Sequence, residues 1–288
     1  MDYACVRAYA KVNLTLDIAG VSGGYHLLDS LVASVDIYDE ICVRRREDGL
    51  VRVTMHGLGE NIPPEGNNAL ACAERYVKRF GTTGADITVN KRIPIGAGLG
   101  GSSADVAGVL NALNAVYGAT DYSGLKEIAD SLGSDCGYML NGGFARIAGR
   151  GDRVERIDCP VTLYLGLLLP SKGVSTAECF KLYDGLNERQ LPSTENAVRA
   201  LVSGDCASLG KGLNNALTRS AILLNNEIED CITALEGLDP LGVGMTGSGS
   251  GVFALFATEE LLRQAQARYR GSATFITTKT VIPSMEER

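Results

Sequence analysis

The chain has 288 residues, of which 45% are hydrophobic and 21% are charged, and its formal net charge is −7. This length suffices for two modest hydrophobic cores, and the composition excludes disordered and collagen-like proteins. An acidic average also argues against a broad nucleic-acid-binding or membrane-binding surface. We therefore expect neither nucleic acid nor a membrane as a partner.

The cysteines and the N-terminal residues indicate in which cellular compartment the protein is expected. The eight cysteines are scattered, without a C-x-x-C pair or a Cys/His cluster at metal-ligand spacing, so we expect reduced and mostly buried thiols. The first residues do not have the pattern of a signal peptide, and the longest apolar run, residues 163–169, is too short to span a bilayer. Together these features favour a cytoplasmic protein.

The first half of the chain is expected to be rich in strands. Alternating apolar residues predict strands over residues 6–18, 30–46 and 50–57. Helical spacing then predicts a helix that begins at Asn67 or Asn68 and ends at Gly81. A strand over 85–95 leads into a glycine-rich loop, and the next helix is expected to end at Gly118.

The second half mixes helices and strands without a repeating β-α-β pattern. The expected elements are a helix over 122–133, a strand over 161–170, a helix over 221–237, paired strands within 241–257, a helix over 259–271 and a strand over 273–282. This order favours an α+β fold with two domains. With a boundary near residues 157–160, we expect domains at 1–157 and 158–288.

The loop "PIGAGLGGSSADVAGVL", which begins at Pro94, carries the clearest chemical signal. Glycines let backbone amides approach an anion closely, and a helix that begins there adds its positive dipole end. Ser102 and Ser103 add hydroxyls that can cap the helix, contact phosphate oxygens or reach a magnesium ion. We expect a nucleotide phosphate to be bound by Pro94, Ile95, Gly96, Ala97, Gly98, Leu99, Gly100, Gly101, Ser102, Ser103 and Ala104.

Other phosphate-binding loops fit less well. A Walker loop needs a lysine, and none lies between Arg92 and Lys126. A G-x-G-x-x-G match starting at Gly96 keeps an NAD-dependent oxidoreductase as an alternative, but a second helix follows where a parallel strand should come. A protein-kinase loop is disfavoured because the chain has no H-R-D or D-F-G segment.

Two further features could belong to the same site. The stretch "MTGSGSGVF", residues 245–253, is a second glycine-rich turn, and it could form another wall around an anionic ligand. Lys11 interrupts an apolar strand pattern. It is either an exposed strand residue or a half-buried lysine that needs a charged partner.

Three segments in this order, "AYAKVNLTL", "PIGAGLGGSSADVAGVL" and "MTGSGSGVFALF", resemble the GHMP small-molecule kinases. The segments "GGYHLLDSLVASVDIYDEI", "LGSDCGYMLNGG" and "GVSTAECFKLYD" are similar to those of the branch that phosphorylates a cytidine-diphosphate-linked methylerythritol. The resemblance implies an N-terminal domain like domain 2 of ribosomal protein S5, a ferredoxin-like C-terminal domain and an active site between them.

The resemblance also implies an activity. It is transfer of the ATP γ-phosphoryl group, with Mg²⁺, to the 2-hydroxyl of that substrate in non-mevalonate isoprenoid synthesis. Kinases of the same family that act on mevalonate derivatives, homoserine or sugars remain alternatives, as does a catalytically silent protein of this fold. Either a monomer or a homodimer is compatible with the sequence.

The resemblance assigns roles to single residues. Asp135 matches the catalytic aspartate that accepts or orients the proton of the substrate hydroxyl, and Lys11 matches its lysine partner. From the residues alone, an Asp after Gly-Ser at a helix start is more simply an N-cap. Ser103 is the expected magnesium ligand, although Ser102 could take its place.

Five residues match substrate-binding positions of the family. Tyr25, His26 and Phe180 match positions that bind cytosine, with two rings stacking on the base and the histidine meeting its edge. Tyr183 is an alternative to Phe180 as the stacking ring. The resemblance places hydrogen bonds to the substrate at Asn13 and Thr176.

The chain departs from the family pattern at four positions. Tyr9 and Gly23 stand where proline and aspartate are common, and Ser102 and Ala104 replace a usual glycine and serine. The loop keeps its length while its serines shift along it. Which hydroxyl faces the phosphates therefore stays open.

Overall fold

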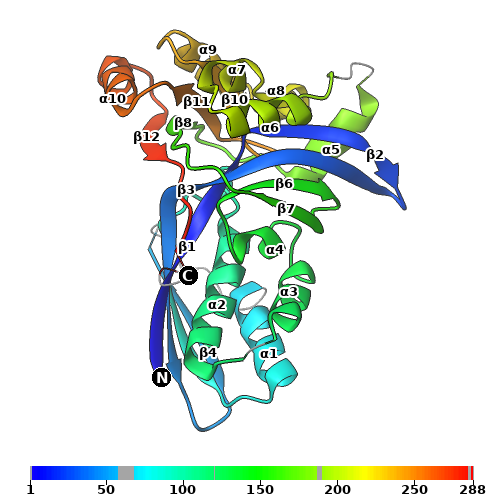
Figure 1. Ribbon diagram of the computed structural model, residues 1–288, viewed down its shortest axis with the longest axis vertical. Helices are drawn as coiled ribbons and strands as arrows, with labels where there is room; N and C mark the ends of the chain where they lie inside the picture. The colour runs from blue at the N-terminus through cyan, green and yellow to red at the C-terminus, as the bar shows by residue number, and fades with distance from the viewer. Residues whose placement is uncertain (1, 58–67, 120, 187–189, 285–286, 288) are drawn as a thin grey trace.

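The computed structural model describes residues 2–57, 68–119, 121–186, 190–284 and 287. Its strands form two sheets, one of eight strands and one of four. The molecule is elongated: the first sheet extends from the lower part of Figure 1, where helices cover it, to the upper right, and the four-stranded sheet lies in the upper part. This arrangement confirms the expected α+β class.

The long strand β3 (Tyr25–Arg45) organises the eight-stranded sheet. It pairs antiparallel with β1 (Tyr3–Asn13), β2 (Thr15–Ser22), β5 (Ala85–Asn90) and β6 (Phe144–Gly149). The remaining strands are β4 (Val51–His56) beside β5, β7 (Arg153–Ile157) beside β6, and β9 (Asn214–Asn215) beside β2. The single strand expected over 6–18 is thus two strands, because the chain bends at Leu14 and β2 then pairs with a different stretch of β3.

Four helices cover one face of this sheet (Figure 1): α1 (Asn68–Phe80), α2 (Gly101–Tyr117), α3 (Tyr122–Asp130) and α4 (Cys136–Met139). Helix α2 packs against β1 and β3 on one side and α1 on the other, so it is buried along most of its length. It ends as expected at Gly118, whose left-handed backbone (φ 70°) lets its amide donate to the Asn114 carbonyl.

The second sheet has the antiparallel order β10, β11, β8, β12. These strands are β8 (Tyr164–Leu169), β10 (Gly242–Met245), β11 (Val252–Phe256) and β12 (Thr274–Lys279). The helices of this half are α5 (Thr176–Gly185), α6 (Thr194–Ser203), α7 (Cys206–Lys211), α8 (Thr218–Leu224), α9 (Glu227–Glu236) and α10 (Glu259–Arg268).

The prediction of a single helix over 221–237 is wrong. The chain forms α8 and α9 instead, and Asn225 between them has an extended backbone (φ −150°). The Asn225 side chain donates to the Lys172 carbonyl and accepts from the Glu227 amide. Asparagine can satisfy loose backbone groups in this way, so it ends one helix and helps begin the next.

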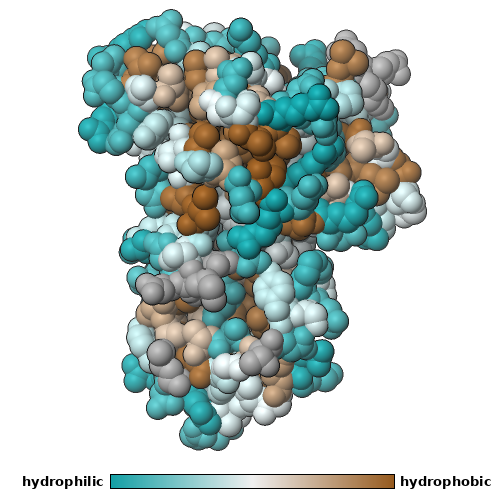
Figure 2. All heavy atoms as spheres, in the orientation of Figure 1, coloured by the Kyte–Doolittle hydropathy of each residue, from teal (hydrophilic) through white to brown (hydrophobic). Residues whose placement is uncertain are grey.

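The end of the chain returns to the first sheet. The Val281 amide donates to the Ser34 carbonyl at 3.0 Å, and the Arg7 amide donates to the Glu287 carbonyl at 2.8 Å. On the face seen in Figure 2, hydrophobic side chains gather where the upper and lower parts meet. The two halves are therefore tied by backbone as well as by packing. None of the helices described is both long and apolar enough to cross a membrane.

The expectation that all cysteines are reduced is wrong for one pair. Cys5 on β1 lies directly opposite Cys42 on β3, and the two form a disulfide. The other six cysteines are free, and five of these are buried. The two cysteines lie 37 residues apart in the sequence, and their pairing depends on the register of β1 against β3, which cysteine spacing alone does not reveal.

The disulfide predicts a thiol count. Protein purified without reductant and then denatured should show six reactive thiols, and eight after reduction. Replacing both Cys5 and Cys42 by serine should lower the free energy of unfolding of the oxidised protein by about 3–4 kcal/mol, because a closed loop of this length restricts the unfolded chain. Eight thiols before reduction would contradict the pairing.

A buried charge cluster joins the first sheet to α2. The Lys91 Nζ atom lies 2.5 Å from Asp39 Oδ2 and 2.7 Å from Asp105 Oδ2, and all three side chains are almost completely buried. The second Asp39 oxygen accepts from the Arg92 and Ile93 amides. Burial, reinforced by the nearby Asp39 carboxylate and only partly offset by the Lys91 ammonium, raises the pKa of Asp105 to about 7.

The raised pKa predicts how stability depends on pH. Because the pKa of Asp105 is higher in the folded chain than its ordinary value of 3.8, its proton stabilises the fold fully below about pH 4. This contribution is lost as the pH rises through about 7. In urea unfolding between pH 5 and 8, Asp105→Asn should remove that decline, whereas an identical pH dependence in both proteins would contradict the assignment.

Candidate active site

The first glycine loop, residues 94–101, connects β5 to α2. Gly96, Gly98 and Gly100 have left-handed backbones with φ of 72°, 70° and 73°. Left-handed residues that alternate along a chain can turn successive amide N–H groups toward one side, which creates an anion-binding concavity. Helix α2 follows at once, and the amides of its first turn have no partner within the helix. The sequence expectation of an amide-rich loop at a helix start is confirmed.

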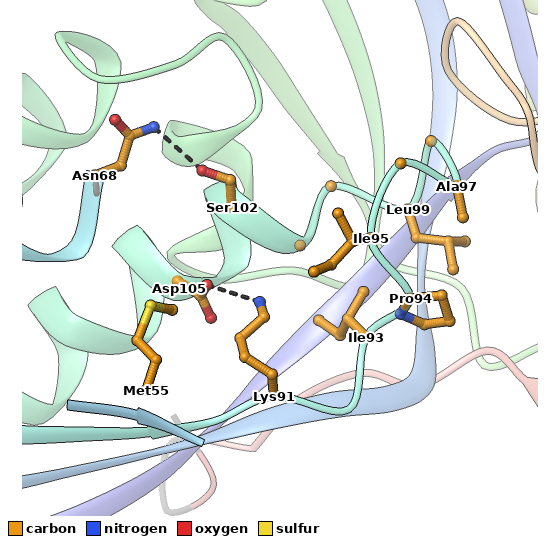
Figure 3. Close-up of a pocket in the computed structure, with 14 residues that line it drawn as sticks. Met55, Asn68, Lys91, Ile93, Pro94, Ile95, Ala97, Leu99, Ser102 and Asp105 are labelled. Carbon is orange, nitrogen blue, oxygen red and sulfur yellow. Dashed lines mark hydrogen bonds and ion pairs between the residues drawn. The ribbon is translucent and has the colours of Figure 1, made fainter. Parts of the chain in front are cut away.

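The loop borders a cavity of about 310 Å³ (Figure 3). Residues 93–102 line it, together with Met55, Asn68, Lys91 and Asp105. Ser102 faces this cavity, and its hydroxyl accepts a hydrogen bond from Asn68 Nδ2 at 3.2 Å. Ser103 and Ala104 do not line it: Ser103 lies beside Cys136, and Ala104 is buried in the core.

The second glycine loop, residues 246–251, supports the first. The Ser250 and Gly251 amides donate to the Gly96 and Ala97 carbonyls at 3.3 and 3.2 Å. The backbones approach so closely that a Cβ atom on Gly98 would lie 2.2 Å from the Thr246 carbonyl oxygen. These two amides are already used within the protein, so they are not available to an anion. That the loop as a whole forms a second wall around an anionic ligand stays a prediction.

Lys11 lies beneath the first glycine loop. Its amide donates to the Leu99 carbonyl at 3.0 Å, and its Nζ atom lies 3.1 Å from Asp135 Oδ2. The Lys11 side chain is 5% exposed and that of Asp135 is 33% exposed. A Cβ atom on Gly100 would lie 3.2 Å from two carbons of the Lys11 side chain, so the lysine depends on that glycine for space. Lys11 is thus a buried lysine with a charged partner.

Asp135 precedes the short helix α4 but does not cap it. Its side chain accepts no hydrogen bond from the first amides of that helix. The carboxylate pairs with Lys11 instead, and a third of its surface stays open to solvent. An ionised carboxylate held by an ammonium in this way can accept a proton or orient a hydroxyl.

Asn13 holds Lys11 in place. Its Oδ1 atom accepts from Lys11 Nζ at 2.5 Å and from the Gly247 amide at 3.0 Å, and its Nδ2 atom donates to Ser30 Oγ at 2.8 Å. Asn13 is 5% exposed. The side chain therefore connects the lysine to the second glycine loop, and a direct contact with a substrate stays a prediction.

The expected base-binding rings come from β3 and α5. The His26 ring stacks on Phe180 with centroids 4.7 Å apart, and the buried Tyr183 ring meets His26 edge-on at 6.2 Å. The Tyr25 ring is exposed, and the Arg150 guanidinium lies 3.5 Å from its centroid. Phe180 is therefore better placed than Tyr183 to offer a ring face.

Thr176, the first residue of α5, is exposed. Its hydroxyl shares a 2.8 Å hydrogen bond with Ser248 of the second glycine loop. Helix α5 is thereby tied to that loop.

Sequence reasoning missed several residues around the site. Lys91 and Asp105 line the cavity beside the first glycine loop, Thr246 donates to the Gly98 carbonyl, and Asp184 contacts His26. Lys91 stands just before the loop, and a lysine that directly follows an apolar strand is a signal from which it could have been predicted. The others occupy ordinary helix or turn positions and give no such signal.

Comparison with known proteins places this arrangement in a family. Residues 67–148 match the model of the GHMP kinases N terminal domain, and residues 197–273 match that of the GHMP kinases C terminal domain. A 4-diphosphocytidyl-2-C-methyl-D-erythritol kinase from Pelotomaculum thermopropionicum is 38% identical over 96% of this chain and 98% of its own length. A kinase of the same name from Carboxydothermus hydrogenoformans is 35% identical over 92% of each chain.

Solved structures agree with the sequence matches. A crystal structure of 4-(cytidine 5'-diphospho)-2C-methyl-D-erythritol kinase superposes with a TM-score of 0.78 at 30% identity, covering 96% of this chain and all of the other. Homoserine kinase from Cytophaga hutchinsonii shares the fold, with a TM-score of 0.73 at 22% identity over 98% and 95% of the two chains. The chain therefore belongs to the GHMP kinases and is a small-molecule kinase.

Proposed function

We propose that this chain transfers the γ-phosphoryl group of ATP to the 2-hydroxyl of 4-diphosphocytidyl-2-C-methyl-D-erythritol, a step of non-mevalonate isoprenoid synthesis. The observation that carries the proposal is the Lys11–Asp135 pair, 3.1 Å apart, directly beneath an amide-rich loop. The substrate is taken from the names of relatives that align along nearly the whole chain.

In this proposal the first glycine loop binds the triphosphate. Amides around Gly98 and Gly100 and the dipole of α2 neutralise the phosphate oxygens, and Lys91 and Asn68 border the cavity that receives the rest of the nucleotide. Phosphoryl transfer needs mainly positioning and charge neutralisation, which such a loop supplies.

Magnesium fits the donors that are present. In the described part of the chain no three His, Cys, Asp or Glu side chains form a group that could hold a metal. Mg²⁺ often takes only one or two protein ligands and completes its shell with phosphate oxygens and water. We propose the Ser103 hydroxyl as the ligand, with Ser102, which faces the cavity, as its alternative. The bound ion would neutralise charge on the phosphates.

Asp135 and Lys11 act on the accepting hydroxyl. The Asp135 carboxylate, partly open to solvent, orients the hydroxyl and takes its proton. The Lys11 ammonium, held by Asn13, stabilises negative charge that develops on the attacking oxygen. Neither step requires a covalent intermediate with the protein.

The rings around His26 bind the cytosine end of the substrate in this proposal. Tyr25 and Phe180 offer faces for stacking, His26 meets the base edge, and Thr176 and Asn13 bind other polar groups of the substrate. This ring cluster favours a base-containing substrate over homoserine or mevalonate derivatives. We further propose that the protein is cytoplasmic and forms a monomer or a homodimer. Its two domains would comprise residues 1–157 and 158–288.

The roles of the pair can be tested with two variants. Asp135→Asn keeps the shape of the side chain but removes its charge, and Lys11→Met keeps most of the packing but removes the ammonium. Each should lower kcat by about 10²–10⁴, the range typical of acid-base groups. ADP release with Mg-ATP and 4-diphosphocytidyl-2-C-methyl-D-erythritol measures the effect, and thermal unfolding checks that both variants fold.

Lys126 and Asp130 form a comparable but more exposed ion pair on α3. Lys126→Met and Asp130→Asn therefore serve as matched controls and should retain wild-type kcat. Unchanged turnover in the Asp135 and Lys11 variants would refute their roles. Turnover of homoserine or a mevalonate derivative, without activity on the cytidine compound, would refute the substrate.

A further inference from the structure

Asp184 of α5 contacts His26 of β3 across 158 residues of sequence. The distance from His26 Nε2 to Asp184 Oδ1 is 2.7 Å, which is a well-formed hydrogen bond. The His26 ring is also held by the Phe180 face and the Tyr183 edge. The imidazole is therefore fixed on three sides, and its side chain is only 16% exposed.

The contact decides which ring nitrogen carries the hydrogen. A carboxylate only accepts, so the hydrogen of a neutral His26 must lie on Nε2. The other nitrogen, Nδ1, then presents a lone pair and can only accept. Among the described residues, Nδ1 has no hydrogen-bond partner.

A second carboxylate, that of Asp17, lies near His26 but makes its hydrogen bonds with other residues. Asp17 lines a cavity of about 240 Å³ together with His26, Tyr183 and Asp184. Its oxygens accept from the Ser193 and Thr194 amides at 2.9 and 2.8 Å and from the Ser193 hydroxyl. Asp184 is thus the carboxylate in this cavity that pairs with the imidazole.

Stability does not account for the contact. The Asp184 side chain is 57% exposed, and exposed ion pairs contribute little to folding. The contact has another consequence. Because the Asp184 carboxylate accepts at one nitrogen of His26, it sets the direction of the hydrogen bond that the other nitrogen can make.

We infer that Asp184 is a positioning residue that makes His26 Nδ1 an acceptor and so selects a pyrimidine with an amino group at ring position 4, cytosine, over one with a carbonyl there, uracil. The inference rests on the proposed function, because it assigns His26 to the base edge. The 4-amino group of cytosine donates to Nδ1. The 4-carbonyl of uracil would face it as a second acceptor, and a site with such a mismatch rejects the wrong ligand.

Binding of CDP and UDP at pH 8, measured by calorimetry, tests the selection. The wild type should prefer CDP by about 10- to 100-fold, since one mismatched polar pair is worth this much. Asp184→Asn can either donate or accept, so the preference should fall by about tenfold.

Two further variants distinguish an effect on the preference for CDP over UDP from a general effect on the structure. Asp184→Glu retains an acceptor-only group and should keep most of the preference. Glu178→Gln removes the same charge from an exposed position on the same helix and should leave both affinities unchanged. If Asp184→Asn weakens CDP and UDP equally, the contact is merely structural and the inference is overturned.

The tautomer itself can be observed without any turnover. The ¹⁵N shifts of His26 at pH 8 should place the hydrogen on Nε2 in the wild type and give a mixture in Asp184→Asn. A hydrogen on Nδ1 in the wild type would overturn the inference. A wild type that shows the expected tautomer and CDP preference but does not phosphorylate the cytidine-linked alcohol would instead refute the proposed function alone.

Discussion

The amino group of Lys11 can lie beneath the first glycine loop because Gly100 leaves room for its side chain. A Cβ atom at residue 100 would lie 2.6 Å from the Met139 methyl carbon and 3.2 Å from two Lys11 carbons, so both side chains would have to shift. Any residue other than glycine would also have to adopt a left-handed backbone there. The same geometry brings the lysine to 3.1 Å from Asp135. One constraint thus places an amide-rich loop, an ammonium and a carboxylate together, and the proposed phosphoryl transfer uses all three.

The site is completed by residues from both halves of the chain. The second glycine loop supports the first through two amides and the Thr246 hydroxyl, and Gly247 of that loop donates to Asn13 beside Lys11. Helix α5 brings Phe180 and Asp184 to His26. A displacement of one half relative to the other would therefore disturb all three parts of the proposed site at once: the first glycine loop, the Lys11–Asp135 pair and the rings around His26.

Local patterns in the sequence predicted the local structure well. The loop between β5 and α2 and the helix ends at Gly81 and Gly118 follow from glycine chemistry that needs no tertiary information. The sequence pattern did not predict the break between α8 and α9 at Asn225, because apolar residues continue at helical spacing across it. The Cys5–Cys42 pair, the Lys91 cluster and the burial of Lys11 depend on strand register and on contacts distant in sequence, so periodicity could not decide them. The resemblance to a family supplied Asp135, which alone would have been interpreted as a cap.

A crystal structure of the protein with Mg²⁺ and a non-hydrolysable ATP analogue would test the central claim most directly. The account predicts that the triphosphate contacts the amides of the first glycine loop and the start of α2, with its terminal phosphate beside Lys11 and Asp135. A triphosphate bound elsewhere, distant from both residues, would contradict it.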